Sequence, residues 1–133
     1  MFSIANLTRQ PLPRLPFADL AATVLGPTYN LSLVFIGDTR ARRLNRVYRQ
    51  KETPANVLSF SLAKTEGEIF INLARARREH EKFGLPPAAH VGYLFIHGAL
   101  HLKGYAHGST MEKKERAIMR RFRLHEQKHR RRS

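Results

Sequence analysis

The chain has 133 residues, no cysteine and a formal net charge of +14 at pH 7, a size that fits one domain without disulfides or thiolate metal ligands. So strong a positive charge favours a polyanionic partner, with nucleic acid first and an anionic membrane surface second. No apolar run approaches the ~20 residues that span a bilayer, and the N-terminal segment lacks the apolar core of a signal peptide, so we expect a cytoplasmic protein.

Two strands and two helices are predicted in the first half of the chain, in alternation, at residues 2–6, 17–25, 31–36 and 38–48. The second strand has the sequence LSLVFI, and its apolar, β-branched content is typical of a buried strand. Asp38 stands where a carboxylate caps the helix that follows. Leu44, Val47 and Tyr48 are apolar residues of that helix, and we expect them to face the core.

The second half of the chain adds two strands and three helices. The strands are predicted at residues 57–62 and 68–71, with 63–67 as a hairpin loop between them. The helices are predicted at residues 72–83, from Pro86-Pro87 to Gly104, and from Ser109 onward, where 109–112 form a capping box. These elements predict a single α+β domain over residues 1–133, with a mixed sheet of about four short strands and about five helices. The last few residues are expected to be a disordered basic tail.

Three histidines form the pattern H-x3-H-x2-G-x2-H at His97, His101 and His107. Two histidines four residues apart lie on one face of a helix, close enough to share one metal ion. Gly104 can end the helix in a left-handed turn, so that His107 returns as a third ligand. Three nitrogen ligands leave the fourth position of a tetrahedral zinc open, as in catalytic sites. The helix around the pair is apolar on nearly every side, so we expect the metal site to lie on a buried helix.

This spacing copies the zinc signature of metzincin proteases, in which a glutamate follows the first histidine and acts as general base. Gly98 occupies that position here, and no carboxylate lies between His97 and His107. The pattern therefore predicts the ligand geometry of a hydrolytic metal site without the peptidase base, which argues against proteolysis.

Basic residues gather in three segments, at residues 40–51, 75–78 and 113–132. Each segment by itself is compatible with an ordinary solvated helix face, and the last with a disordered arm. Few acidic residues balance the three together, which favours contacts with the phosphates of a nucleic acid.

Three segments carry a resemblance to a known family. Residues 97–107 are HGALHLKGYAH, residues 48–61 are YRQKETPANVLSFS, and residues 67–71 are GEIFI. They resemble the signatures H-G-x-L-H-L-x-G-Y-D-H, Y-R-x-K-D-x-P-T-[DN]-V-L-S-F-P and G-D-I-x-I of the YbeY family of metal-dependent endoribonucleases, which mature ribosomal RNA. The segments occur in the family's order, and the resemblance covers roughly residues 31–122.

The resemblance implies that His97, His101 and His107 bind the metal, and that Arg49 is a catalytic residue pointing toward the metal cleft. A guanidinium group suits this role, because it is permanently charged and can hold a phosphate through two parallel hydrogen bonds. One departure concerns proton transfer, since Ala106 replaces the aspartate that precedes the family's third histidine.

Other acidic and histidine residues are possible additions to the site. Glu68 and Glu112 are candidates to approach the metal. His90 precedes the first ligand by seven residues, about 10.5 Å along a helix axis, which is too far to share the ion. His80, His125 and His129 are expected to be solvated.

Residues and resemblance together predict a zinc-dependent, single-strand-specific endoribonuclease that acts in ribosomal RNA maturation and ribosome quality control. One zinc ion per chain is expected, with RNA, ribosomal RNA and ribosomal particles as partners, no membrane and no small-molecule cofactor. Three imidazoles also accept nickel, copper or manganese, so the spacing alone leaves the metal open. The alternative is a ribosome- or RNA-binding assembly factor with a structural metal and little catalysis. A metalloprotease is the other rival, and Gly98 disfavours it.

Overall fold

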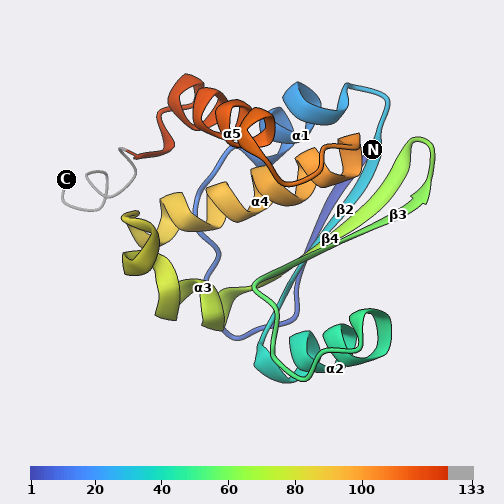
Figure 1. The fold of residues 1–133 in the computed structure, drawn as a ribbon, viewed down its shortest axis with the longest axis vertical. Helices are drawn as coiled ribbons and strands as arrows, with labels where there is room; N and C mark the ends of the chain where they lie inside the picture. Colours follow the sequence, from blue (N-terminus) through green and yellow to red (C-terminus); the bar gives the residue numbers. More distant parts are fainter. Residues whose placement is uncertain (126–133) are drawn as a thin grey trace.

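A computed structural model describes residues 1–125 of the protein, and the predicted basic tail at 126–133 lies outside these described residues (Figure 1). Four strands form one sheet in the order β1-β2-β4-β3. The strands are β1 (Phe2–Asn6), β2 (Asn30–Ile36), β3 (Val57–Ala63) and β4 (Glu66–Asn72). β1, β2 and β4 run parallel and β3 is antiparallel to β4, which confirms the predicted mixed sheet and the hairpin between β3 and β4.

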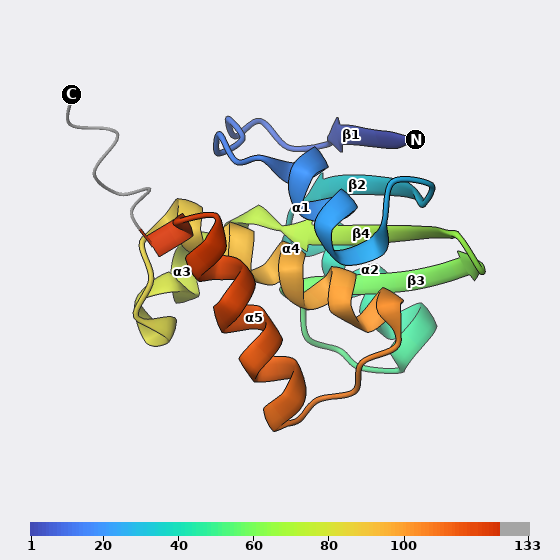
Figure 2. The same cartoon turned by 90° about the horizontal axis from the view of Figure 1, so that it is seen from above.

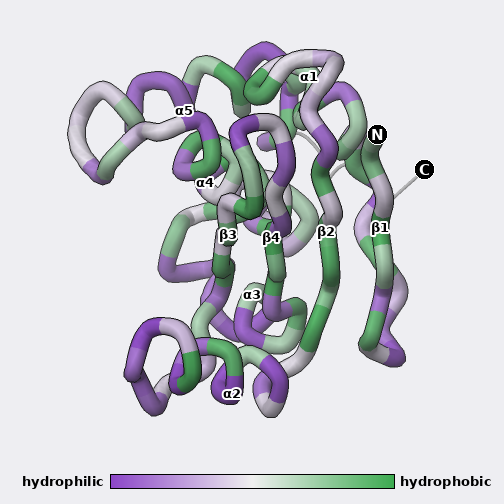
Figure 3. Tube along the Cα trace, turned by 90° about the vertical axis from the view of Figure 1, so that its right-hand side faces the viewer, coloured by the Kyte–Doolittle hydropathy of each residue, from purple (hydrophilic) through white to green (hydrophobic). Residues whose placement is uncertain are grey.

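Alternate side chains of the central strands pack into the core. Leu33 and Phe35 of β2 and Ile69 and Ile71 of β4 are each 0% exposed, and they share one hydrophobic cluster with residues of α1 and α4. The intervening residues of β4 point to the opposite face, because successive side chains of a strand alternate. Figure 3 shows the hydrophobic residues concentrated along β2, whereas much of α2 is hydrophilic.

Five α-helices lie within residues 1–125, as predicted: α1 (Phe17–Leu25), α2 (Asp38–Arg49), α3 (Leu73–Glu79), α4 (Pro87–Lys103) and α5 (Ser109–Arg121). A short 3-10 helix, His80–Phe83, follows α3, so the single predicted helix at 72–83 is divided in two. Figures 1 and 2 show α1, α4 and α5 on one side of the sheet, while α2 stands apart on the other side. α4 is the central helix, and most of its residues are buried, which confirms the prediction of a buried histidine helix.

The orientation predicted for α2 is wrong. Val47 and Tyr48 are 63% and 64% exposed, and the helix instead buries Ala41 and Asn45. The amide of Asn45 donates a hydrogen bond of 2.7 Å to the carbonyl of Thr53, so the returning chain covers the polar residue and leaves the large apolar ones outside.

Both predicted side-chain caps are also wrong. Gly37 is the N-cap of α2 and Gly108 is the N-cap of α5, and neither helix has a side-chain cap. Asp38 instead accepts hydrogen bonds from Arg78 and Asn72. The hydrogen bond from Arg78 is the main reason that the pKa of Asp38 lies below its ordinary value, so the carboxylate serves a tertiary contact that local sequence cannot reveal.

Candidate metal centre

His97, His101 and His107 converge as their spacing predicts. One ring nitrogen from each lies within 4.8 Å of the others. His97 and His101 occupy successive turns of α4, and Gly104 ends the helix with a φ of 113°. That left-handed conformation is accessible to glycine at little cost, and it turns the chain back so that His107 faces the pair.

In His97 and His101 the Nδ1 atom is the one with a hydrogen-bond partner in the protein, which leaves Nε2 available to bind a metal ion. The Nδ1 atom of His97 lies 2.5 Å from a carboxylate oxygen of Glu115, and the Nδ1 atom of His101 lies 3.0 Å from the carbonyl of Tyr105. A proton on each Nδ1 satisfies these acceptors and leaves Nε2 with its lone pair. Metal-binding histidines are held in this way by carboxylate or carbonyl partners.

The distance between the ring nitrogens of His97 and His101 fits a tetrahedral ion. The two Nε2 atoms of His97 and His101 are 3.2 Å apart, and two nitrogens bound to one zinc at tetrahedral angles are separated by about 3.3 Å. Burial lowers the pKa of His101, and the neighbouring His97 and His107 lower it further. The imidazole is therefore mainly neutral at pH 7, which is the form that binds metal.

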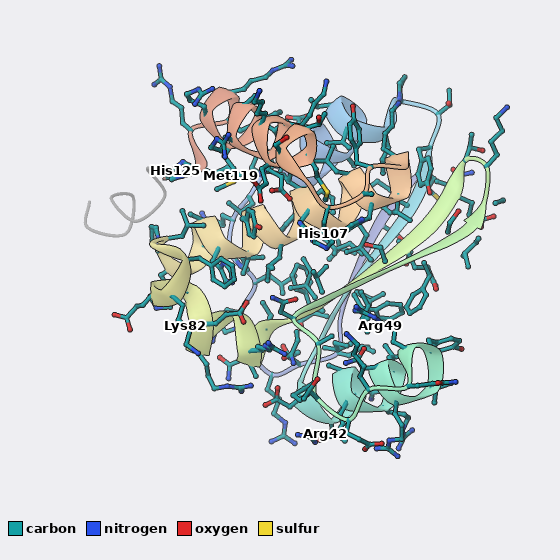
Figure 4. All side chains as sticks on the ribbon, in the orientation of Figure 1. Arg42, Arg49, Lys82, His107, Met119 and His125 are labelled. Carbon is teal, nitrogen blue, oxygen red and sulfur yellow. The ribbon has the colours of Figure 1, made fainter. Side chains whose placement is uncertain are left out.

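A cleft of about 720 Å³ opens beside the three histidines. It is lined by Arg49 from α2, residues 56–60 at the start of β3, Tyr93 from α4 and the three histidines. Figure 4 shows Arg49 on the side of α2 that faces the sheet and His107, and Arg42 on the opposite side of the same helix. The last residue of α2 and the end of α4, which are distant in sequence, thus line one cleft.

Gly98 faces the sheet and not the cleft. A Cβ atom at this position would lie 2.8 Å from the hydroxyl oxygen of Ser59 and 3.3 Å from methyl groups of Val57 and Ile69. The Ser59 hydroxyl donates to the Gly98 carbonyl across the same close contact, at 3.0 Å. A glutamate base of the metzincin kind has no room here, because α4 packs directly on β3 and β4.

We therefore expect Gly98→Glu to destabilise the fold by about 3 kcal/mol or more, because the side chain meets packed atoms and its charge has no buried partner. Urea unfolding followed by circular dichroism measures this loss. Ala117→Glu, on the exposed side of α5, is the matched control and should change stability by less than about 0.5 kcal/mol. Equal stability of the two variants would show that α4 does not pack this closely.

Glu115 is the site residue that the sequence analysis missed. Glu68 is half-buried and Glu112 is exposed, and neither lines the cleft. Glu115 is only 4% exposed and contacts His97 from α5. A signal was present, since Glu115 lies midway between Met111 and Met119 on the buried face of the helix. A lone carboxylate on an apolar face requires a partner.

Replacing Glu115 with glutamine should weaken metal affinity about 10- to 100-fold, because a neutral amide orients the imidazole less firmly and makes its Nε2 less basic. Competition with a chromophoric chelator measures this affinity without any nuclease assay. Glu112→Gln, one turn earlier on the exposed side of α5, is the control with the same change of charge. Unchanged affinity in Glu115→Gln would mean that the contact has no influence on the metal centre.

His90 serves the core and lies outside the triad. It is 0% exposed, and its Nε2 atom is 2.8 Å from a carboxylate oxygen of Glu79. Burial lowers the pKa of His90. Burial raises the pKa of Glu79, but hydrogen bonds from Asn56, His90 and Arg75 outweigh it and leave this pKa below its ordinary value. His90 is thus a neutral imidazole paired with a carboxylate. His80 is half-buried rather than solvated, with Nδ1 2.8 Å from the Leu85 carbonyl.

The three basic segments differ in their freedom to bind phosphate. In the second segment, Arg75 pairs with Glu79 and Arg78 pairs with Asp38, so these side chains serve the fold. One arginine of α2 forms an ion pair within the described residues. Arg46 lies 3.7 Å from Glu52, and both side chains are exposed. The first segment supplies Arg49, the one arginine or lysine among the cleft-lining residues of the described chain. No helix within residues 1–125 combines the length and apolar composition needed to cross a membrane.

Comparisons with known proteins identify the family. The protein-family model described as Endoribonuclease YbeY matches residues 15–127. A protein named Endoribonuclease YbeY from Geobacter metallireducens is 37% identical over 137 residues, covering 87% of this chain and 91% of that protein. One of the same name from Geobacter sulfurreducens is 34% identical, covering 83% and 87%.

A solved structure has a similar fold. The solution structure of a Thermotoga maritima protein superposes with a TM-score of 0.65 at 18% identity, covering 96% of this chain and 95% of that one. This likeness supports the α+β architecture alone. The family match spans Arg49, the three histidines and Glu115. On the family match and the similarity to its curated relatives, the chain belongs to the YbeY endoribonuclease family.

Proposed function

We propose that the protein is a zinc-dependent endoribonuclease that cleaves single-stranded regions of RNA during ribosomal RNA maturation. One observation carries the proposal: three imidazoles spaced for one ion share a cleft with Arg49, an exposed guanidinium from a distant helix. A metal ion and an arginine that line one cleft suit a phosphodiester substrate, because each can stabilise the negative charge on its phosphate oxygens. The relatives named Endoribonuclease YbeY support the same activity.

His97, His101 and His107 would hold the ion, and when bound it supplies Lewis acidity and a water molecule of lowered pKa. Glu115 accepts the Nδ1 proton of His97 in a hydrogen bond, and the Tyr105 carbonyl accepts that of His101, so both rings keep the orientation that binding needs. Arg49 would hold a non-bridging phosphate oxygen and stabilise the charge that develops there.

The cleft limits which groups move protons. None of the cleft-lining residues in the described part of the chain is a carboxylate, and Ala106 stands where the family resemblance implies an aspartate. The Ser59 hydroxyl donates to the Gly98 carbonyl, so it is engaged in packing. Because the cleft offers no carboxylate base, hydrolysis at this site would rely on a water molecule whose pKa the bound metal ion has lowered.

Zinc, one ion per chain, is the metal we propose, because neutral imidazole ligands in tetrahedral arrangement suit it. The domain would act as one unit over residues 1–133. Ribosomal particles are the proposed partners, with a part in ribosome quality control and a cytoplasmic location. The excess of cations on α2 and α5 favours such polyanionic surfaces.

The direct test is cleavage of a structured RNA with single-stranded ends. The purified protein is stripped with a chelator, and zinc, manganese, nickel or magnesium is then added back in separate reactions. We expect no cleavage without metal, restoration by zinc, and cuts confined to the single-stranded ends. Tight zinc binding without cleavage of any RNA would instead favour an assembly factor with a structural metal, which the missing carboxylate keeps open.

A further inference from the structure

Three aromatic side chains form a row on the sheet face that looks away from α4. The ring of Tyr48 in α2 lies 5.1 Å from that of Phe60 in β3, and the ring of Phe60 lies 5.8 Å from that of Phe70 in β4. Tyr48 is 64% exposed, and the two phenylalanines are half-buried. Phe60 pairs with Glu68, and Phe70 pairs with Leu58, so all these strand residues share one face of the sheet.

This aromatic row does not belong to the core. The hydrophobic core cluster and the side chains packed against it come from the other face of the sheet, and none of the three rings is among them. The wrongly predicted orientation of α2 has the same origin, since Tyr48 faces Phe60 and solvent instead of the core. A contiguous apolar patch that reaches the surface is a candidate binding site, whereas single exposed apolar residues are not.

The row borders the metal cleft. Phe60 is among the residues that line the cleft together with Arg49 and His97, so the edge strand β3 brings the row to the margin of the cleft. The residue that follows Tyr48 in α2 is Arg49 itself. A ligand that lies on the row therefore passes the edge strand β3 to reach the histidines, which lie on the α4 side of the sheet.

The charge beside the row selects the kind of ligand. α2 carries the exposed arginines Arg40, Arg42, Arg43, Arg46 and Arg49, of which Arg46 has the exposed partner Glu52. Two acidic residues of β4 share the aromatic face, the exposed Glu66 and the half-buried Glu68, so the arginines outnumber the acids beside the row. Rings for stacking beside an excess of cations are the combination that binds single-stranded nucleic acid, whereas an apolar protein partner would leave these arginines without use.

We propose that Tyr48, Phe60 and Phe70 form a stacking platform for the unpaired bases of RNA, and that the arginines of α2 hold the phosphates of the same strand. The platform leads the strand toward the metal cleft. It discriminates against duplexes, because paired bases are already stacked on one another and keep their faces covered. This inference rests on the proposed function and adds to it the means by which the site selects single strands.

The test measures equilibrium binding in the His101→Ala background, so that cleavage does not consume the probe. Fluorescence anisotropy compares a short labelled single-stranded RNA with a blunt duplex of the same sequence. Tyr48→Ala should weaken single-strand binding roughly 5- to 100-fold and leave duplex binding unchanged. Tyr48→Phe keeps the ring and should restore the affinity, and Val47→Ala, the exposed neighbour, is the matched control.

The outcomes separate the two proposals. Equal single-strand affinity of Tyr48→Ala and its parent, or loss of duplex and single-strand binding together, would overturn the platform while RNA cleavage by the wild type stands. A selective loss in Tyr48→Ala supports the platform even if the wild type cleaves nothing. Because Tyr48 is largely exposed, its truncation should leave the fold intact, and the unchanged duplex affinity checks this directly.

Discussion

His101→Ala should abolish RNA cleavage, with a loss of at least about 1,000-fold, and should release the metal. His101 belongs to the proposed metal-binding triad: its Nε2 atom lies 3.2 Å from that of His97, and its Nδ1 atom is 3.0 Å from the Tyr105 carbonyl oxygen. Two imidazoles alone give too few ligands to retain zinc against a chelator. Metal content per chain and cleavage rate should fall together, and the thermal midpoint should also fall, because the ion ties α4 to the loop that carries His107.

The control for this experiment is His125→Ala, prepared identically. His125 is exposed at the end of the described chain, so its loss tests the effect of removing a histidine without touching the triad. A protein of net charge +14 can carry a contaminating ribonuclease, and the paired preparation exposes it. If His101→Ala cleaved RNA as fast as His125→Ala, the activity would not come from this metal centre.

Arg49→Ala should slow cleavage by about 100- to 1,000-fold while the metal content stays at one ion per chain. Arg49 is exposed and ends α2, so its truncation should not disturb the core. The loss should fall mainly on kcat, because the guanidinium stabilises charge that develops in the transition state. Arg49→Lys should recover only part of the rate, since an ammonium group cannot form the two parallel hydrogen bonds of a guanidinium.

Arg42→Ala is the control for the effect of Arg49→Ala on kcat, because the loss of a phosphate contact away from the metal should appear in KM. Both arginines belong to α2, but Arg42 lies on the side of the helix away from His107 (Figure 4). A general effect of positive charge would slow both variants alike and would show chiefly in KM and in the salt dependence. Similar rates for the two variants would remove Arg49 from the catalytic machinery and leave it as one of several phosphate contacts.

Much of the metal centre followed from local geometry. The placement of His97 and His101 on one helical face depends only on the period of an α-helix, and the turn at Gly104 depends on the freedom of glycine at positive φ. Strands with apolar, β-branched sequences, such as β2, were equally accessible, because alternation and composition are local properties. The burial of α4 followed from its nearly uniform apolar sequence.

The errors lie where a residue had more than one possible partner. Asp38 had the sequence of a cap but accepts hydrogen bonds from Arg78 and Asn72. Tyr48 had the hydropathy of a core residue but lies against Phe60 at the surface. The local preference of Asp38 for the cap is worth about 1 kcal/mol, and tertiary contacts brought close by the folded chain outweigh it. Tyr48 likewise has a tertiary partner in Phe60 that the local sequence does not reveal.

The sequence by itself therefore determines that the three histidines converge, because one helix and the turn at Gly104 bring their ring nitrogens together. The partnership of His97 with Glu115, the approach of Arg49 and the aromatic row beside it come from the strand order β1-β2-β4-β3 and the packing of α2 and α5. These contacts join residues far apart in sequence. Their geometry depends on the burial of many side chains at once, which no short segment encodes.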